Sequence, residues 1–568
     1  MNKKLYASLL LLVLSMSWTA CERVETEPRD WIKEDLVWDQ QDKNATLAVF
    51  FLNDIYNYIP NGFNRIGRAN NANNGDFLDT GAGDAIPSRT NRAVEYYTNG
   101  IISVVNNPDP YWGNSYAGIR RVNIFLANID KVPATPASIA TWKAEARYIR
   151  AHLYFELLKR YGGVPLIADK VFTIEDNLSL PRNTFEECVN YIKTECDAIK
   201  GSLTPEPVSD NNWGRIPRGA AIALKSRLLL YAASPLFNGG GVSTNPSLKT
   251  LNGYASYDVA RWQSALDAAN ELINLNYYAL QASYNNIFVV KKNTEIILAK
   301  QVANNTDIES FNAPIGYGSP AASQGLTSPT QNLVDAFPMN NGLDITNPLS
   351  GYSAQAPYLN RDPRLALTVF FNGQTWLRRN VETFEGGKDK PGGNLVQTRT
   401  GYYLRKFMAD FATNTTYTNQ SHNFPIFRYA EILLNAAEAL NELDKTEDAV
   451  KRVIDIRKRA GIKAGTDNRY GIKAAISKDE LRTLIQNERR IELAFEEHRF
   501  WDLRRWKIGE SALSGALMGM RITTKTDGTF NYAPVQVGNM VFSKKLYYMP
   551  LPYDETLKNP SLIQNEGW

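Results

Sequence analysis

Apolar residues recur at helical spacing in two blocks of the chain, and a long irregular stretch separates these blocks. In the segment 139–161, apolar side chains return every three or four residues, which is the repeat of one face of an α-helix. That face carries Ala144, Tyr148, Ala151, Phe155 and Leu158. Helices are predicted over 46–58, 112–129, 139–161, 184–199, 218–231 and 257–275 in the first block, and over 424–443, 446–460 and 478–506 in the second.

Successive amphipathic helices joined by short loops predict a mainly α-helical fold. Such pairs favour an α-solenoid scaffold of the tetratricopeptide kind. The 34-residue consensus of that repeat is not legible in the sequence, so this interpretation depends on the pairing of the helices.

The stretch 276–422 has a different character, because Gly, Pro, Asn and Tyr are frequent in it. Short apolar runs at 296–299 and 365–371 predict a few strands and short helices within otherwise irregular loops. Long ordered loops are usually functional, so this stretch is expected to carry a ligand site. We therefore expect one domain over 21–568, with an N-terminal helical part to about 275 and a C-terminal helical part with a strand-like tail from about 423.

The first residues have the order of an export signal. Lys3 and Lys4 precede an apolar run over 9–14, and small residues follow up to Ala20. A permanent membrane span needs roughly 20 apolar residues, so this shorter run predicts a cleaved signal peptide over 1–20. Cys21 would then be the first residue of the mature chain.

Cys21 resembles the lipidated cysteine of a bacterial lipobox, although Trp18 stands where such signals usually carry Leu. A lipid on Cys21 would anchor the chain to a membrane surface. The alternative is an ordinary secretory signal followed by a chance cysteine. Glu22 and Glu25 resemble the acidic surface-export signal of lipoproteins in Bacteroidetes-type bacteria, which favours the outer face of the outer membrane.

Charge and metal-ligand chemistry exclude several classes of function. The chain has 63 basic and 59 acidic residues, a balance that gives no basic stripe for nucleic acid. Its three histidines are scattered, and Cys188 and Cys196 lie too far apart on one predicted helix for a disulfide. We expect no metal and no cofactor, and we expect both of these cysteines to be buried.

The most specific motif is NERRIELAFEEHRFWDLRRWK, which covers 487–507. Taken alone, it predicts a solvated amphipathic helix with weak ion pairs such as Arg499 with Asp502. As a sequence it resembles the C-terminal signature of the SusD/RagB family of outer-membrane nutrient-binding lipoproteins. Similar segments lie in the same order along the chain: YAGIRRVNIFLAN, GGVPL after the helix 144–161, GRIPRGAAIALKSRLLLYAASP, RDPR and NPSLIQNEGW.

This resemblance implies a lipid-anchored cell-surface protein with about four tetratricopeptide-like helix pairs. It implies that the chain captures a nutrient, most often an oligosaccharide or polysaccharide, and delivers it to a SusC-like TonB-dependent transporter. The alternative is a scaffold, an adhesin or a peptide-binding member of the same family with no glycan ligand.

Polar and aromatic residues that suit a sugar site follow the first helix. Rings can stack on sugar faces, and carboxylates, amides and guanidinium groups can bind hydroxyls. The expected ligand-binding residues are Asp84, Arg89, Tyr96, Tyr97, Phe311, Tyr317 and Tyr352. The alternative for each is that it packs or caps a loop. Trp112, Trp501 and Trp506 are expected to be structural, and Trp376 is undecided.

A catalytic role is not expected. A glycosidase needs two carboxyl groups that flank the scissile bond, and the adjacent Glu496 and Glu497 point to different sides of their predicted helix. The sequence contains no GxSxG, P-loop or HExxH motif. Asp76, Asp79 and Asp84 do not have the spacing of an EF-hand.

Overall fold

The computed structural model describes residues 34–67, 74–239, 241–318 and 322–568. The expected signal peptide and Cys21 lie outside the described residues. Within these ranges, no helix has both the length and the apolar character that a membrane crossing needs.

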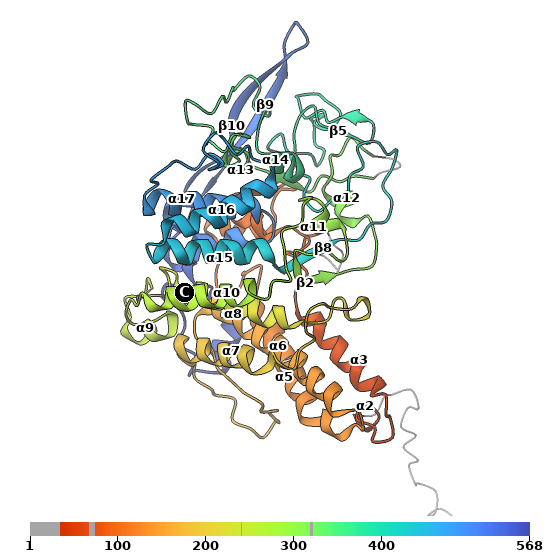
Figure 1. Ribbon diagram of the computed structural model, residues 1–568, viewed down its shortest axis with the longest axis vertical. Helices are drawn as coiled ribbons and strands as arrows, with labels where there is room; N and C mark the ends of the chain where they lie inside the picture. The colour runs from red at the N-terminus through yellow and green to blue at the C-terminus, as the bar shows by residue number, and fades with distance from the viewer. Residues whose placement is uncertain (1–33, 68–73, 240, 319–321) are drawn as a thin grey trace, which may run out of the picture.

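Eight long helices form a stack in which each packs on the next (Figure 1). They are α5 (Tyr111–Asn128), α6 (Pro136–Tyr161), α7 (Phe185–Ile199), α8 (Arg218–Ala233), α10 (Ala260–Ile273), α15 (Tyr429–Glu442), α16 (Thr446–Ala460) and α17 (Lys478–Glu492). The chain is thus mainly helical and built from neighbouring helix pairs, as predicted. Trp112, Trp501 and Trp506 are buried, also as predicted.

Local sequence signals explain where these helices begin and end. The Thr135 hydroxyl caps α6 by accepting a hydrogen bond from the backbone N–H of Ser138, and Gly162 ends the helix with a positive φ. A capping box between Thr184 and Glu187 begins α7. Cys188 and Cys196 are free and buried within α7, as expected.

The remaining helices are short: α2 (Glu34–Val37), α3 (Thr46–Ile55), α4 (Tyr96–Asn99), α9 (Pro246–Asn252), α11 (Asn286–Val289), α12 (Asp307–Asn312), α13 (Gln331–Ala336), α14 (Pro363–Thr368), α18 (His498–Arg505), α19 (Gly509–Ala512) and α20 (Tyr553–Lys558). The strands are β1 (Ala85–Pro87), β2 (Ile296–Gln301), β3 (Thr327–Pro329), β4 (Val369–Phe370), β5 (Thr375–Trp376), β6 (Arg379–Asn380), β7 (Tyr403–Leu404), β8 (Asn423–Arg428), β9 (Gly515–Thr524) and β10 (Phe530–Met540). β9 and β10 form the hairpin of the strand-like tail.

The irregular stretch is an insertion between two adjacent members of the stack. α10 packs on α15, although residues 274–428 lie between them in the chain. At the two ends of this insertion, β2 pairs antiparallel with β8, which closes its base against the helices. The insertion also contains the antiparallel pairs β4–β7 and β5–β6, and β3 pairs with β1 from the N-terminal part.

Two predicted helices differ from the structure. The predicted helix over 424–443 begins only at Tyr429, because 424–428 belong to β8, whose six side chains are all buried beside β2. The predicted helix over 478–506 is broken between α17 and α18. Phe495 and Glu497 have positive φ angles there, and the Phe495 N–H donates to the Asp79 carboxylate instead of continuing a helix.

Most of the charged residues of the 487–507 motif are buried, so the expectation of a solvated helix is wrong. Glu492 accepts hydrogen bonds from Arg364 and Arg428 at 2.7 Å each and also pairs with Arg459. Arg489 donates to Asp502 at 2.8 Å, in place of the Arg499 predicted as its partner. Such buried pairs contribute through directional hydrogen bonds, and an unpaired member is costly.

This arrangement predicts that Glu492→Gln strongly destabilises the protein. The substitution leaves Arg364, Arg428 and Arg459 with less negative charge in a region that excludes water. We expect the free energy of unfolding to fall by about 3 kcal/mol or more, measured by urea denaturation. Asp479→Asn is the control, because Asp479 lies on the same helix with its side chain 87% exposed, and we expect a change below about 1 kcal/mol. An equal fall in the free energy of unfolding in both variants would contradict the claim that the buried charge of Glu492 stabilises the fold.

A second buried carboxyl lies on the 3₁₀ turn Leu78–Gly81, which packs on α18. Burial, followed by the nearby Asp84 carboxylate, raises the pKa of Asp79 to about 8. Within the described residues the Asp79 Oδ2 atom has no hydrogen-bond partner. Asp79 is therefore protonated in the folded protein at neutral pH and ionised in the unfolded chain.

The raised pKa of Asp79 predicts how stability depends on pH. The folded state holds a proton that the unfolded state releases, so this group's stabilising contribution is present below about pH 4 and is lost as pH rises to about 8. Asp79→Asn replaces the protonated carboxyl with a neutral group. We expect its melting temperature relative to the wild type to increase from about pH 5 to about pH 9. A difference that does not vary with pH would contradict this assignment.

Candidate ligand-binding cleft

A cleft of about 450 Å³ opens on the surface of the insertion. Its walls come from the start of α11, from the end of α14 with β4 and β5, and from the loop after β7. The lining residues are Ser283, Asn285, Asn286, Ala366, Leu367, Phe370, Gln374, Thr375, Trp376, Arg405 and Asp410. This volume lies within the range of small-ligand sites, roughly 300–1,000 Å³.

The lining includes a guanidinium group that lies over two aromatic rings. The guanidinium carbon of Arg405 lies 4.5 Å from the ring centroid of Trp376 and 5.6 Å from that of Phe370. The indole N–H of Trp376 donates to the Tyr417 hydroxyl at 3.1 Å. Trp376, undecided from the sequence, is thus a buried support for Arg405 and is almost inaccessible itself.

Two amide side chains offer free hydrogen-bonding groups at the rim. Asn285 and Asn286 are half-buried, and their carboxamides make no hydrogen bond to any residue that the structure describes. Gln374 differs, because its side chain binds the backbone of Ala366 and Phe371. Asp410 is exposed and accepts from the Ala412 N–H. The free groups at the rim are therefore the carboxamides of Asn285 and Asn286, which can donate hydrogen bonds to hydroxyl or charged oxygen atoms and accept them from hydroxyl groups.

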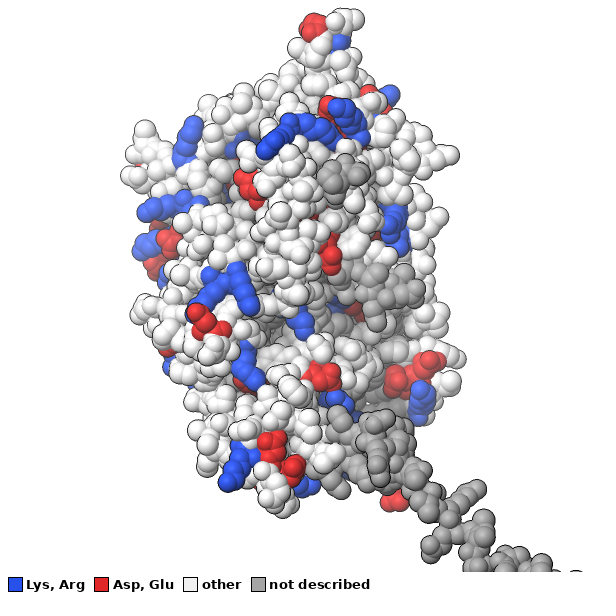
Figure 2. All heavy atoms as spheres, turned by 90° about the vertical axis from the view of Figure 1, so that its right-hand side faces the viewer, with Lys and Arg blue, Asp and Glu red and all other residues white. Residues whose placement is uncertain are grey.

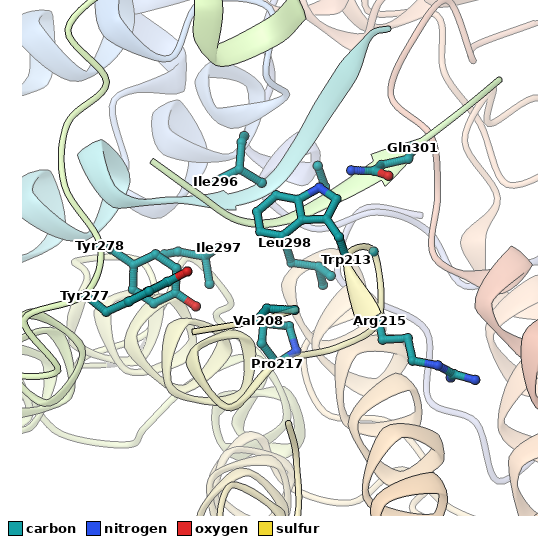
Figure 3. A pocket seen from close by; sticks show the side chains of 12 residues that line it. Val208, Trp213, Arg215, Pro217, Tyr277, Tyr278, Ile296, Ile297, Leu298 and Gln301 are labelled. Carbon is teal, nitrogen blue, oxygen red and sulfur yellow. The ribbon is translucent and has the colours of Figure 1, made fainter. Parts of the chain in front are cut away.

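A second pocket lies between β2 and the segment that leads into α8 (Figure 3). Trp213, Tyr277 and Tyr278 enclose it, while the Arg215 side chain points away. It offers about 10 Å³ to water-sized occupants, which is about the room of one water molecule. This pocket therefore has no room for a sugar ring.

Asp84 and Tyr97, both expected at the ligand surface, lie in the protein interior. The Asp84 carboxylate pairs with Arg490 of α17 at 2.5 Å. The Tyr97 ring packs edge-on against Phe500, and its hydroxyl donates to Asn107 at 2.8 Å. Both side chains are at most 2% exposed, so in this conformation they hold the loop over 76–97 against the signature helices.

Three other expected residues come together around the loop 323–326. Arg89 donates to the Gln324 side chain at 3.2 Å, and the backbone oxygen atoms of Phe311 and Tyr317 accept from Leu326 and Ser323. Tyr317 is buried under Arg379, whose guanidinium carbon lies 3.6 Å from the ring centroid. Arg89 and Phe311 remain partly accessible beside it.

Tyr96 and Tyr352 complete the expected set. Tyr96 begins α4 and is half-buried, and Tyr352 is half-buried near Arg361, 5.5 Å from its guanidinium carbon. None of the seven expected residues is part of the cleft lining described above. A chain of hydrogen bonds nevertheless leads from the 323–326 loop to the cleft, through Ser323, Tyr417 and Trp376.

Asn285, Asn286 and Arg405 were not expected from the sequence. The available signal was the pair of asparagines directly after an aromatic residue, and only the fold brings this pair into one cleft with Arg405. On the side of the molecule that carries the insertion, basic and acidic side chains are interspersed over a largely uncharged surface (Figure 2). The positive charge of Arg405 in the cleft is therefore not part of a larger basic patch on this side of the molecule. No described group of three or more His, Cys, Asp or Glu side chains is placed to hold a metal ion.

Comparison with known proteins connects this geometry to a family. A family model described as the SusD family matches residues 294–568, and one described as "Starch-binding associating with outer membrane" matches residues 39–230. The curated SusD-like protein P2 of Formosa agariphila is 26% identical over 510 residues, which is 86% of each chain.

Solved structures have the same fold. A SusD-like protein from Bacteroides fragilis superposes with a TM-score of 0.76 and 27% identity, covering 95% of this chain and all of that one. A SusD-like carbohydrate-binding protein from the same species has a TM-score of 0.72 at 22% identity, covering 92% and 99% of the two chains. A laminarin-binding SusD-like protein has a TM-score of 0.62 at 22% identity, with the same coverage. At these last two identities the likeness shows the fold alone.

Proposed function

Since this chain belongs to the SusD/RagB family, we propose that it is a glycan-binding protein of the outer membrane that holds its ligand in the cleft of the insertion. The family description names starch binding and the outer membrane, and two neighbours in fold are described as binding carbohydrate and laminarin. The observation that carries the proposal is the set of free groups in the cleft: the carboxamides of Asn285 and Asn286 beside the stacked Arg405.

The chemistry of this cleft suits a sugar. Amide groups can donate and accept at once, which matches hydroxyl groups that do both. The cleft is open to solvent on the insertion, so a section of a longer polymer can enter it. Apolar atoms of Ala366 and Leu367 line the wall formed by α14 and can contact the C–H face of a sugar ring.

Binding accounts for this lining better than catalysis does. Hydrolysis of a glycoside takes two carboxyl groups about 5–9.5 Å apart, and among the described residues that line the cleft only Asp410 carries one. Glu496 and Glu497, the adjacent pair of the motif, are engaged by Lys406, Arg428 and Arg65.

We further infer a lipid anchor on Cys21 at the outer face of the membrane, and a SusC-like TonB-dependent transporter as the partner. The lipobox-like sequence at the N-terminus and the family membership support both inferences. The stacked helices would serve as the scaffold that docks to the transporter and leaves the insertion free for the ligand.

The cleft predicts which amides the glycan needs. Calorimetry of the chain that begins after Cys21, against plant, host and microbial polysaccharides, should identify a ligand. We expect the double variant Asn285→Ala, Asn286→Ala to weaken its binding about tenfold, because two neutral hydrogen bonds are lost. The matched control is Asn211→Ala, Asn212→Ala, a pair in the helical part whose side chains make no hydrogen bond among the described residues.

The same measurement separates the cleft from the surface expected from the sequence. Loss of binding in Arg89→Ala, Tyr96→Ala, with the asparagine variant unaffected, would move the site to that surface and leave the function standing. Lack of binding across the whole panel would contradict glycan binding and favour a peptide ligand or a scaffold role.

Lipidation predicts how the full-length protein fractionates. We expect labelled palmitate on the wild type and on Cys188→Ala, and none on Cys21→Ala, which should leave the membrane fraction. From detergent-solubilised outer membranes, the wild type should co-purify with a TonB-dependent barrel. Label that persists on Cys21→Ala would contradict the anchor, and purification without any barrel protein would contradict the partner.

A further inference from the structure

Arg405 is a buried cation that forms no ion pair with any residue that the structure describes. Most buried arginines of the described chain pair with a carboxylate, as Arg364, Arg428 and Arg505 do. Arg405 is only 5% exposed, yet it makes no ion pair with a described residue. Its one hydrogen bond goes from Nη1 to the Met408 carbonyl oxygen at 2.7 Å.

Other buried arginines that pair with no described carboxylate each donate at least two hydrogen bonds, as Arg504 does to the carbonyl oxygen atoms of Leu546 and Phe500. Arg361 donates to three backbone carbonyl groups, and Arg182 donates to three backbone oxygen atoms and two asparagine side chains. Arg405 donates only one hydrogen bond to a described residue, and its Nε and Nη2 atoms have no partner there. Unlike Nε of Arg361 and Nη2 of Arg504, these two nitrogen atoms are not among the fully enclosed unsatisfied atoms, so they keep contact with solvent, and Arg405 lines the cleft.

Contact with the Trp376 and Phe370 rings limits the movement of this guanidinium group. Burial lowers the pKa of Arg405 to about 10, against the opposing effects of Asp410 and Glu309, so the group is cationic at neutral pH. Glu309 is engaged elsewhere, because it binds His422 and the Ala409 N–H. Asp410 is exposed at the rim. Burying a cation of this kind costs free energy unless an anion pairs with it.

We propose that the cleft selects glycans that carry an anionic substituent, a uronic acid carboxylate or a sulfate ester, and that Arg405 binds this group through its two free N–H edges. This inference depends on the proposed glycan-binding function and specifies its ligand class. The planar fork of an arginine matches two oxygen atoms of one anion. Asn285 and Asn286, which line the same cleft from the start of α11, would then bind hydroxyl groups of the same or the next sugar.

The test compares glycans that differ only in charge. Polygalacturonate and alginate are measured beside their carboxyl-reduced forms, and dextran sulfate beside dextran, by calorimetry with the chain that begins after Cys21. We expect at least about tenfold tighter binding of one anionic form, the size of a charge-assisted hydrogen-bond pair. Rising salt should weaken that binding and leave the neutral form unaffected. The carboxylate and sulfate arms identify which anion the cleft takes.

Variants assign the preference to Arg405. Arg405→Gln should bind the anionic and neutral forms equally, and Arg405→Lys should retain part of the preference. Arg378→Gln is the control, since it removes an exposed arginine of the same insertion that does not line the cleft. If Arg405→Gln fails to fold, the wild type still tests the anionic preference. The test is its affinity for each charged glycan beside the neutral form, and the salt dependence of that binding.

The outcomes separate this inference from the proposed function. Equal affinity of the wild type for charged and neutral forms would overturn the role of Arg405 and leave glycan binding standing. An anionic preference that survives in folded Arg405→Gln would also overturn it. Absence of binding to every form, charged and neutral, would overturn both proposals.

Discussion

Glu492 and Glu496 hold the three walls of the cleft, through their two buried carboxylates and the backbone carbonyl group of Glu492. Tyr284, directly before Asn285, donates its hydroxyl to the Glu492 carbonyl oxygen at 2.8 Å. Arg364 of α14 binds the Glu492 carboxylate at 2.7 Å, and Lys406, directly after Arg405, binds Glu496 at 2.6 Å. Each wall of the cleft is thus one or two residues from a group bound by Glu492, which ends α17, or by Glu496, which follows it. The stack therefore positions the insertion through hydrogen bonds, two to buried carboxylates and one to a backbone carbonyl group.

Directional bonds suit this task because the insertion has little regular structure. Apolar packing alone accepts many arrangements of loops, whereas a buried charge is costly in every arrangement that leaves it unpaired. Arg428 shows the principle, since it ends β8 and binds Glu295, Glu492 and Glu496 together. The two ends of the insertion and the signature motif then have one arrangement that pairs Arg428 with all three carboxylates.

The sequence predicted the stacked helices well, because a helix that buries one face repeats that face in its pattern. It predicted the wrong environment for 487–507, since the same spacing of charged residues fits an exposed face or an interior full of counter-ions. The extended segment 424–428 was also missed, because its pairing partner β2 lies more than a hundred residues earlier. Errors of this kind arise where distant segments decide the local structure.

The candidate site was harder to predict for a related reason. A carboxylate or an aromatic ring in a loop suits a sugar equally well before its neighbours are known, and Asp84 and Tyr97 turn out to have protein partners. Arg405 and Lys406 make the point most directly, because these consecutive cations are both buried. Lys406 is neutralised by Glu496, while Arg405 lines the cleft and pairs with no carboxylate in the described part of the chain. The distribution of carboxylates around them, which only the fold determines, assigns one cation to the structure and leaves the other for a ligand.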